Sequence, residues 1–388
     1  MNAKIIIIGI NNANTLGLIR SIGISGRRPD VLLEPCNLRF CSLRFSKYIG
    51  KLHILKTTES ALDVLRSEYW DECVKPVILC SSDKSVALLN EHYDELSPRF
   101  SFFNAGFSGR VGFFLDKVNT FHLAAKSGIE IINTRTIHGG HPIPIDIACP
   151  CIVKGGNSTK SSKSDMCICR SKGCLIAATS KDIDYLVQDY IEKEYELDIV
   201  GLSLDHGNRI IMPGAVNKVR EFIDRQSLFV RLDDIGKYLD LPLDGIRKLV
   251  SAIRYEGIFS VELIFSKGKY YFLEINLRND WTAYIYTRSG ANYPLLWVKY
   301  AEGSLCDEDV NAIKLHTPTY MMQEADLYAV FEGRTNFFRW FYDFCRTDVF
   351  PVLNVRDLKP FLYIMCIHVV QVLKRPLKKL GFCKGKKV

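Results

Sequence analysis

The chain has 388 residues, of which 47% are hydrophobic and 24% charged, a composition typical of a soluble globular protein with two or three domains. Nearly all of the net charge of +8 lies in the last fifteen residues, which hold seven Lys or Arg and no acid, so basicity is a property of the tail. Thirteen cysteines, an odd number scattered along the chain, exclude a regular disulfide framework and favour a reducing compartment.

The first 110 residues are predicted to form a doubly wound α/β domain. Continuous apolar runs indicate buried parallel strands at residues 4–9, 30–33 and 75–80. The intervening segments predict helices at residues 14–25 and 84–96. The first turn lacks G-x-G-x-x-G, so no dinucleotide fingerprint is present. Ligands of such sheets bind at the carboxyl ends of the strands, and the polar residues there are Asn11, Asn12, Ser82 and Asp83. Helix and turn capping is the alternative role for these four residues.

A helix is predicted after Asp116 and Lys117, ending before Gly128, with a short strand at residues 129–132. Further along, a strand that ends at Lys154 runs into a loop of Gly, Ser and Lys at residues 155–164. Free backbone N–H groups and lysine charges suit such a loop to bind phosphates. It is not a Walker A loop, and a surface linker is the alternative interpretation.

A helical region is predicted at residues 232–252, followed by a hairpin whose strands cover residues 259–265 and 270–277. The period of two places Glu274 and Asn276 on one face, and Glu262 is expected to face the same way. Two carboxylates and an amide oxygen are ligands that suit Mg²⁺. A solvated strand face is the alternative.

Two Cys-x-Cys pairs, at residues 149–151 and 167–169, resemble half-sites for zinc. Within a strand, however, this spacing places two small apolar side chains on one face, and structural zinc sites favour C-x2-C, so we prefer the apolar interpretation. His138 and His141 are expected in a polar loop without an acidic or cysteine partner.

The chain changes character after residue 305. A strongly apolar helix is predicted at residues 361–373, followed by the basic tail, residues 374–388. Thirteen residues fall short of the ~20 that span a bilayer as a helix. Residues 361–388 therefore either make peripheral membrane contact, with lysines at anionic headgroups, or dock on the body of the protein. Nucleic-acid binding is not expected, because Phe382 is the only aromatic residue in the basic run.

Five motifs in this order resemble the ATP-grasp superfamily, over roughly residues 1–300. They are Asp116-Lys117 before a helix, Lys154 before the small-residue loop, Gln188-Asp189-Tyr190-Ile191 with Glu194, Glu262 in the first hairpin strand, and Glu274-Ile-Asn276-Leu-Arg278 in the second. The resemblance implies an α/β fold with an N-terminal doubly wound pre-ATP-grasp domain, a two-lobed ATP-grasp domain and a helical C-terminal extension. The corresponding boundaries are residues 1–110, 111–305 with a flexible lobe at about 151–190, and 306–388.

The resemblance also implies a role for each matching residue, with ATP and Mg²⁺ as cofactors and Mn²⁺ as a substitute metal. The phosphate ligands are Lys117 and Lys154. The adenine contacts are Gln188, Asp189 and Ile191, and the ribose ligand is Glu194. The metal ligands are Glu262, Glu274 and Asn276, and the catalytic residues are Arg278 and Lys154. The sequence departs from the family in having Gly155 where proline is usual and Gln188 where glutamate is frequent, although a side-chain oxygen is retained.

The implied activity is ATP-dependent ligation of a small-molecule carboxylate to an amine. The carboxylate attacks the γ-phosphoryl group to give an acyl phosphate and ADP, and the amine then displaces phosphate. Residues 357–360, the Ser81-Ser82-Asp83 run and the long tail are similar to the D-aspartate ligase branch, which includes ligases of the cell envelope and capsule. A location in the cytoplasm or at the inner membrane face follows, because the apolar run at residues 5–8 is too short for a signal peptide. Monomer and homodimer both stay open.

Two other functional classes are considered. A catalytically silent nucleotide-binding protein of the same fold would have lost metal ligands or lysines, and here all are present. A Rossmann-type oxidoreductase would need the glycine fingerprint that residues 9–17 lack.

Overall fold

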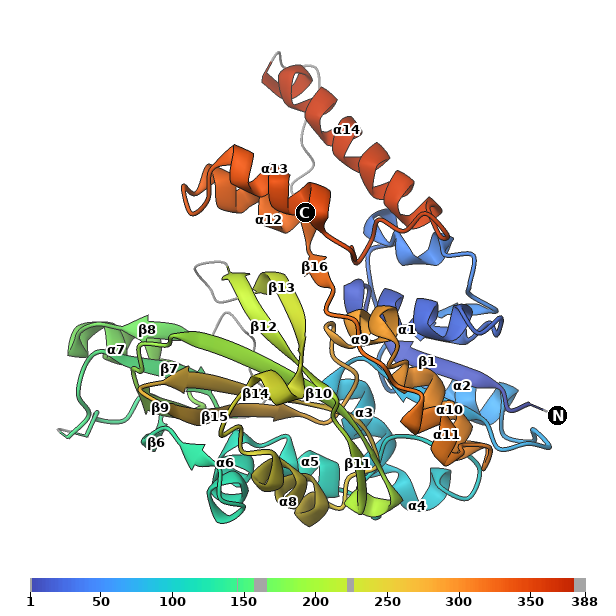
Figure 1. Ribbon diagram of the computed structural model, residues 1–388, viewed down its shortest axis with the longest axis horizontal. Helices are drawn as coiled ribbons and strands as arrows, with labels where there is room; N and C mark the ends of the chain where they lie inside the picture. The colour runs from blue at the N-terminus through green and yellow to red at the C-terminus, as the bar shows by residue number, and fades with distance from the viewer. Residues whose placement is uncertain (1, 145, 157–165, 222–226, 380–388) are drawn as a thin grey trace.

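The computed structural model describes residues 2–144, 146–156, 166–221 and 227–379. Within these ranges the strands form three sheets: a four-stranded sheet in the N-terminal domain, a central eight-stranded sheet, and a four-stranded sheet in a small lobe (Figure 1). Residues 157–164 of the predicted phosphate loop and residues 380–388 of the basic tail lie outside the described residues.

The N-terminal sheet is parallel, with the order β3-β2-β1-β4. Its strands are β1 (Ile5–Gly9), β2 (Asp30–Leu33), β3 (Leu52–Ile54) and β4 (Val77–Cys80). Its helices are α1 (Ala13–Gly23), α2 (Ser60–Glu68), α3 (Asp83–Glu91) and α4 (Tyr93–Leu96). The predicted doubly wound domain is confirmed. The sequence did not reveal β3, because its three residues are only partly buried and carry no continuous apolar run.

The central sheet has the order β16-β13-β12-β10-β14-β15-β5, with β11 paired to β10. Its strands are β5 (Glu130–Ile131), β10 (Tyr195–Leu204), β11 (Arg209–Ile211), β12 (Gly214–Glu221), β13 (Ser227–Asp234), β14 (Gly257–Ser266), β15 (Lys269–Asn276) and β16 (Thr319–Met321). The predicted hairpin is β14–β15. Lys267 and Gly268 at its turn both have positive φ, as a two-residue hairpin turn of type I′ requires.

The predicted helix at residues 232–252 is wrong in its first half. Strand β13 continues to Asp234, and helix α8 (Leu243–Ile253) begins only after Pro242. Proline disfavours helical geometry in the residue before it, so the helix cannot begin earlier.

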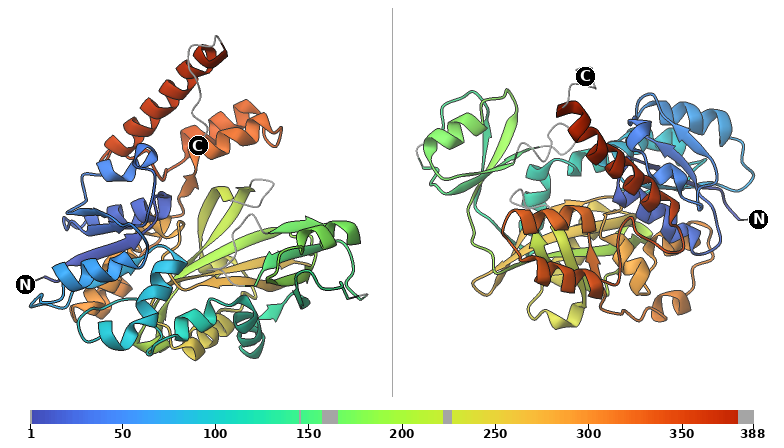
Figure 2. Two further views of the ribbon diagram at one scale, coloured as in Figure 1. Left: turned by 180° about the vertical axis from the view of Figure 1, so that it is seen from behind. Right: turned by 90° about the horizontal axis from the view of Figure 1, so that it is seen from above.

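The small lobe carries a sheet with the order β6-β9-β7-β8 and projects away from the body, as the right-hand view of Figure 2 shows. Its strands are β6 (Thr134–His138), β7 (Cys151–Gly155), β8 (Cys167–Cys169) and β9 (Asp184–Asp189), and its helix is α7 (Lys172–Ala178). The lobe has a hydrophobic cluster of its own, separate from the main core, which includes Cys151, Cys169 and Tyr185.

The remaining helices cover the body and form the C-terminal end. They are α5 (Arg110–Phe114), α6 (Lys117–Lys126), α9 (Ala283–Ser289), α10 (Tyr293–Ala301), α11 (Asp307–Asn311), α12 (Gln323–Phe331), α13 (Phe337–Arg346) and α14 (Lys359–Lys379). Short 3₁₀ turns occur at Leu38–Phe40, Leu43–Phe45, Asp205–Gly207 and Ile235–Lys237.

The segment after residue 305 contacts both the central sheet and the N-terminal domain. Strand β16 pairs with β13, and the buried carboxylate of Asp357 accepts a hydrogen bond from Arg20 of α1, with 3.0 Å between Oδ2 and Nε. The expected helix at residues 361–373 lies inside α14. None of the helices in the described residues is long and apolar enough to cross a membrane.

Candidate active site

The candidate site is built on the β14–β15 hairpin. Glu262 of β14 lies directly opposite Glu274 of β15 in antiparallel register, and Ser260 lies opposite Asn276. Directly opposed residues project from the same face, with Cβ atoms about 4.5–5.5 Å apart, and two carboxylates placed so repel each other. The expectation that Glu262, Glu274 and Asn276 converge is therefore supported by the strand register.

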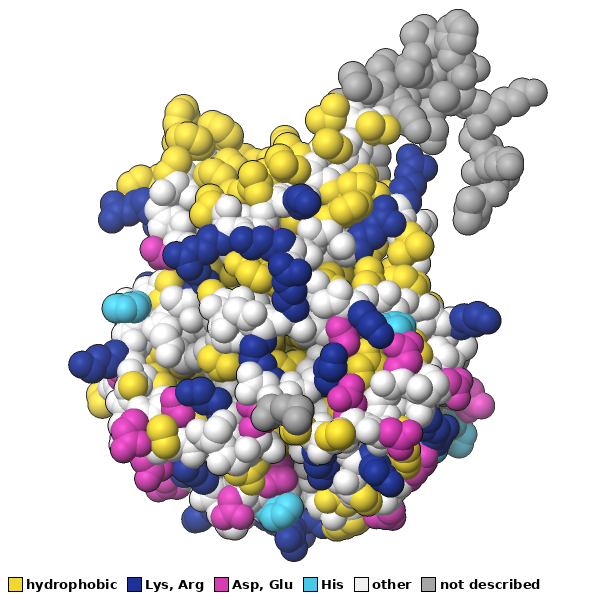
Figure 3. Space-filling view, turned by 90° about the vertical axis from the view of Figure 1, so that its right-hand side faces the viewer, with side chains coloured by type: hydrophobic (Ala, Val, Ile, Leu, Met, Phe, Trp, Pro, Cys, Tyr) yellow, Lys and Arg dark blue, Asp and Glu magenta, His cyan; other side chains and the backbone are white. Residues whose placement is uncertain are grey.

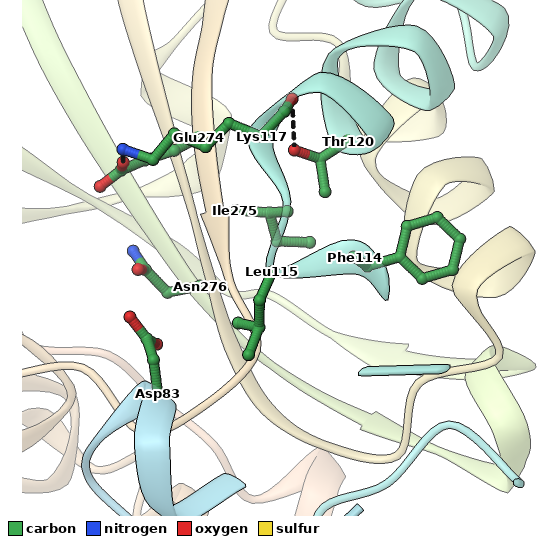
Figure 4. Close-up of a pocket in the computed structure, with 8 residues that line it drawn as sticks. All are labelled: Asp83, Phe114, Leu115, Lys117, Thr120, Glu274, Ile275 and Asn276. Carbon is green, nitrogen blue, oxygen red and sulfur yellow. Dashed lines mark hydrogen bonds and ion pairs between the residues drawn. The ribbon is translucent and has the colours of Figure 1, made fainter. Parts of the chain in front are cut away.

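Each carboxylate has a lysine beside it from another element. Lys117, the first residue of α6, lies 3.1 Å from Glu274 between Nζ and Oε2 (Figure 4), and Lys218 of β12 lies 2.7 Å from Glu262. Attraction to Glu274 raises the pKa of Lys117. Burial disfavours the charge of Lys218, but the carboxylates of Glu262 and Glu196 outweigh it and hold its pKa well above the ordinary value. The site thus alternates positive and negative groups.

Lys154 lies near the end of strand β7, immediately before the predicted phosphate loop. It is only 8% exposed and has no ion pair with any of the described residues. Burial, together with the charge of nearby Lys117, lowers its pKa to about 8. The two lysines are brought together because the backbone N–H of Lys117 donates to the carbonyl of Gly156, just beyond β7. Two lysines close together are the kind of cationic group that binds an anion such as a phosphate chain.

Gln188 is buried at the end of β9. Its Nε2 donates to Thr134 Oγ1 over 3.0 Å, while its Oε1 is buried and has no hydrogen-bond partner among the described residues. A buried acceptor without a donor costs free energy unless a ligand satisfies it. The amino group of adenine is a donor of the required kind.

The other predicted nucleotide contacts are less clearly directed at a ligand. Asp189 is exposed and accepts from Asn133 Nδ2 over 3.0 Å, and Ile191 is half-buried against the cluster around Ile132. Glu194 accepts from the backbone N–H of Lys267 over 2.8 Å, so its carboxylate is bound to the β14–β15 turn. Asp189 is the last residue of β9, Ile191 and Glu194 follow it toward the hairpin, and the roles of these residues as nucleotide contacts stay predictions.

Arg278 follows β15 and is enclosed by acids and carbonyls. Its Nε donates to Asp83 Oδ1 over 2.8 Å, and its two terminal nitrogens reach Asn276 Oδ1, Asp280 Oδ2 and the carbonyl of Asn279. Burial alone would lower its pKa, but Asp83 and Asp280 raise it. Arg278 therefore stays charged and is held in one orientation, beside the metal-ligand candidate Asn276.

A small pocket lies at this point, between the N-terminal domain and the hairpin. Figure 4 shows Asp83 of α3 pointing toward Asn276, with Lys117 and Glu274 side by side above them. Of the residues predicted at the strand ends of the first domain, only Asp83 reaches this site. Asn12 and Ser82 are helix N-caps, so the capping interpretation applies to these two, and Asn11 donates to the carbonyl of Phe40.

Three site residues were not predicted from the sequence: Lys218, Glu196 and Asp198. Asp198 of β10 lies opposite Glu262 in register, so carboxylates from three adjacent strands form a row. Burial, with the nearby Asp280 and Glu262, raises the pKa of Asp198 well above its usual range. The sequence pattern contained one indication of these residues, namely charged side chains inside strands that are otherwise buried.

The expectation that His138 has no acidic partner is wrong. Its ring lies at the end of β6, with Nδ1 2.8 Å from Asp184 Oδ1 and Nε2 2.7 Å from Asp182 Oδ1. Asp184 lies opposite His138 because β6 and β9 are antiparallel, and the sequence alone did not indicate this pairing.

Comparison with known proteins shows similarity at the level of the fold. No protein-family model matches the chain, and no curated protein sequence matches it. Among solved structures, L-amino acid ligase from Bacillus licheniformis matches with a TM-score of 0.63 at 16% identity, over 82% of this chain and 79% of that one. N5-carboxyaminoimidazole synthetase from Staphylococcus aureus matches with a TM-score of 0.62 at 16% identity, over 87% of this chain and 88% of that one.

A third similar structure is the biotin carboxylase domain of Hydrogenobacter thermophilus 2-oxoglutarate carboxylase, in complex with MgADP, ADP and bicarbonate. It matches with a TM-score of 0.60 at 16% identity, over 81% of this chain and 73% of that one. The expected fold class is confirmed: a doubly wound N-terminal domain, a two-lobed ATP-grasp domain and a helical C-terminal extension.

Proposed function

We propose that this chain, which has the ATP-grasp fold, is an ATP-dependent ligase that joins a small-molecule carboxylate to an amine. The observation that carries the proposal is the opposed pair Glu262 and Glu274, flanked by Asn276 and by the lysines Lys117 and Lys218. A catalytically silent protein has no need for this cluster, because taking carboxylates and lysines out of water costs free energy that their mutual attraction only partly offsets.

The residues present suit Mg²⁺ and ATP. Glu262, Glu274 and Asn276 supply the oxygen ligands that Mg²⁺ prefers, and Mn²⁺ accepts the same set. The buried Oε1 of Gln188 suits an adenine amino group, and Lys117 and Lys154 suit phosphates. Asp189, Ile191 and Glu194 complete the proposed nucleotide contacts. When bound, Mg²⁺ neutralises charge on the phosphate oxygens during phosphoryl transfer.

The proposed reaction proceeds through an acyl phosphate. The substrate carboxylate and the γ-phosphate repel each other, and Lys154 and Arg278 reduce this repulsion by placing positive charge beside both. Because Arg278 is held by Asp83 and Asp280, it is already oriented before the substrate binds. The amine then attacks the activated carbonyl and phosphate leaves, which needs no protein nucleophile.

The oxidoreductase alternative is disfavoured by the first turn of the N-terminal domain. A Cβ atom at Gly9 would lie 2.7 Å from Thr15 Oγ1 and even closer to Ser81 Oγ. These two hydroxyls also contact each other at 2.7 Å. Side chains therefore lie against the turn where a dinucleotide fold places its pyrophosphate.

The C-terminal helices support a peripheral location at an anionic membrane, which would suit a substrate of the cell envelope or capsule, as in the D-aspartate ligase branch. Figure 3 shows hydrophobic side chains gathered at the C-terminal end of the molecule, with Lys and Arg beside them. The exposed aromatic residues of α12 and α13 are Tyr328, Phe331, Phe337, Phe338, Phe341 and Tyr342. Aromatic rings beside arginines favour the interface between lipid and water.

The deciding experiment measures phosphate and ADP release from MgATP by the purified protein, against a panel of amino acids alone and paired with amines. Release that requires both an acid and an amine, and is lost in a Glu274→Ala, Asn276→Ala variant, would establish the ligase. Absence of ATP binding at saturating Mg²⁺ would contradict the site. ATP binding without turnover on any substrate, including lipid-linked ones, would favour the catalytically silent alternative.

A further inference from the structure

Five cysteines gather on the small lobe, outside the candidate active site. Cys151 is the first residue of β7 and Cys149 precedes it, Cys167 and Cys169 lie on β8, and Cys174 lies in the first turn of α7. The sulfur atoms of Cys167, Cys169 and Cys174 all lie within 4.8 Å of one another, and the first two are 3.5 Å apart. The sequence interpretation of these residues as small apolar side chains does not account for Cys174, which is exposed.

The strand register explains how the thiols meet. Cys151 lies opposite Cys169 across the antiparallel β7–β8 ladder, so both project from the same face of the sheet. The period of two within β8 places Cys167 on this face as well. Cys174 is added from α7, whose N-cap Ser171 accepts a hydrogen bond from the backbone N–H of Cys174.

We propose that Cys167, Cys169 and Cys174 bind a structural Zn²⁺ ion, with the fourth position taken by Cys151. Zn–S bonds of about 2.3 Å in a tetrahedral site place two sulfur atoms about 3.8 Å apart. The 3.5 Å between the sulfur atoms of Cys167 and Cys169, and the 4.8 Å limit among those of Cys167, Cys169 and Cys174, are close to this value. Thiolate sulfur is the ligand type that selects Zn²⁺ over Mg²⁺.

The lobe has a physical need for such an ion. Strand β8 has three residues, lies at the edge of its sheet, and is paired only to β7. The lobe's own hydrophobic cluster is small, and small cores commonly depend on a metal or a disulfide for stability. In a reducing compartment the metal is the favoured device. The ion would join β8 and α7 to β7, the strand that carries Lys154.

The test is the zinc content of the intact purified protein, measured by mass spectrometry after extensive dialysis, and is independent of ligase activity. We expect about one zinc per chain. A Cys174→Ser variant should lose most of it, and a Cys73→Ser variant, which changes an exposed cysteine of the N-terminal domain, should keep it. Because Cys174 is exposed, its substitution leaves the lobe's core unchanged. Protein reconstituted with Co²⁺ should show sulfur-to-cobalt charge transfer and the visible bands of tetrahedral coordination.

A second measurement needs no variant. Zinc should protect the lobe thiols of the wild type from a maleimide reagent, and removal of zinc by a chelator should expose them, as peptide mapping of Cys167, Cys169 and Cys174 would show. Equal labelling with and without added zinc, together with a zinc-free protein, would overturn the proposal. Zinc retained by Cys174→Ser with an unchanged cobalt spectrum would overturn the ligand assignment.

Discussion

Arg278, just after β15, donates from Nε to Oδ1 of Asp83 at the first turn of α3, over 2.8 Å. This ion pair joins the N-terminal domain to the strand that carries two of the proposed metal ligands. The pocket lined by Asp83, Lys117, Glu274 and Asn276 lies beside it. The carboxylate substrate is therefore expected between the domains, with Arg278 fixed at its side.

Replacing Arg278 by lysine should reduce catalysis more than nucleotide binding. Lysine keeps the charge but not the planar fork that contacts Asp83, Asp280 and Asn276 at once. We expect kcat for phosphate release to fall about 10²-fold, with the Kd for ATP close to that of the wild type. Arg288→Lys, at an exposed arginine of α9, is the matched control and should leave both unchanged. Equal losses of kcat and ATP affinity would contradict a role in orientation.

Affinity for ATP should weaken as pH rises through about 8, where Lys154 loses its proton. Below this pH the lysine is charged and attracts phosphate, and above it the attraction is lost. Lys154→Arg keeps its charge throughout and should show a flat profile between pH 7 and about 9.5. Lys154→Met should bind weakly at every pH. Titration calorimetry across this range gives the Kd values, and a wild-type profile as flat as that of the arginine variant would refute the assignment.

Rising pH should have the opposite effect on the contribution of Lys154 to the stability of the fold. Its pKa is about 8 in the folded protein and about 10.5 when unfolded, so between these values the unfolded chain binds more protons. The contribution of Lys154 to the free energy of unfolding therefore rises with pH across this window. Urea denaturation of wild type and Lys154→Met at pH 7 and 10 should show a difference between the two proteins that grows in favour of the wild type. If the advantage of the wild type over Lys154→Met instead became smaller between pH 7 and 10, the pKa of Lys154 would not be lowered by burial in the folded protein.

Mg²⁺ with ADP should raise the melting temperature of the wild type by several degrees, because binding to the folded state alone stabilises it. Glu274→Gln removes one charge from the opposed pair without changing its shape, and should abolish most of this rise. Glu130→Gln is the control, since Glu130 lies on the neighbouring strand β5 and pairs with Lys269 at the surface. Differential scanning fluorimetry provides the measurement. A full Mg²⁺-dependent rise in Glu274→Gln would exclude this carboxylate as a ligand.

Gln188 should discriminate ATP from GTP, because its buried Oε1 accepts from an amino group and repels the carbonyl that guanine has there. Gln188→Leu is expected to raise KM for ATP about 5- to 10-fold and to reduce the preference of the protein for ATP over GTP. Thr134→Val removes the same Gln188–Thr134 hydrogen bond from its other end, and should leave the preference intact. Nucleotide selectivity lost in both variants would mean that the hydrogen bond, and not Oε1, is responsible.

The exposed aromatic face of α13 should bind anionic vesicles. Phe338 is 84% exposed and Phe341 51% exposed, and arginines 339 and 346 lie on the same helix. Phe338→Ser with Phe341→Ser should strongly reduce sedimentation with phosphatidylglycerol vesicles, whereas Phe113→Ser, at an exposed phenylalanine of α5, should not. High salt should weaken the wild-type interaction by screening. Sedimentation of the double variant at the wild-type level would remove α13 from the contact.

Local pattern was sufficient to predict much of the site. Alternation in residues 270–277, with a glycine turn before it, predicted β15 and the shared face of Glu274 and Asn276, since side-chain direction repeats every two residues. Helix caps could also be predicted, because a cap is a contact between residues close in sequence: the N-cap Ser82 accepts a hydrogen bond from the backbone N–H of Ser85, three residues away. The buried strands β1, β2 and β4 followed from continuous apolar runs.

The tertiary structure decided which of these elements meet. Lys218 reaches Glu262 from a strand 44 residues earlier, Arg278 reaches Asp83 across 195 residues, and Cys174 joins Cys167 by the turn of a helix. No local period encodes such contacts, because the register between strands is set by packing of the whole sheet and not by the residues within one strand. The sequence thus determined the chemical groups and their faces, and the fold determined their partners.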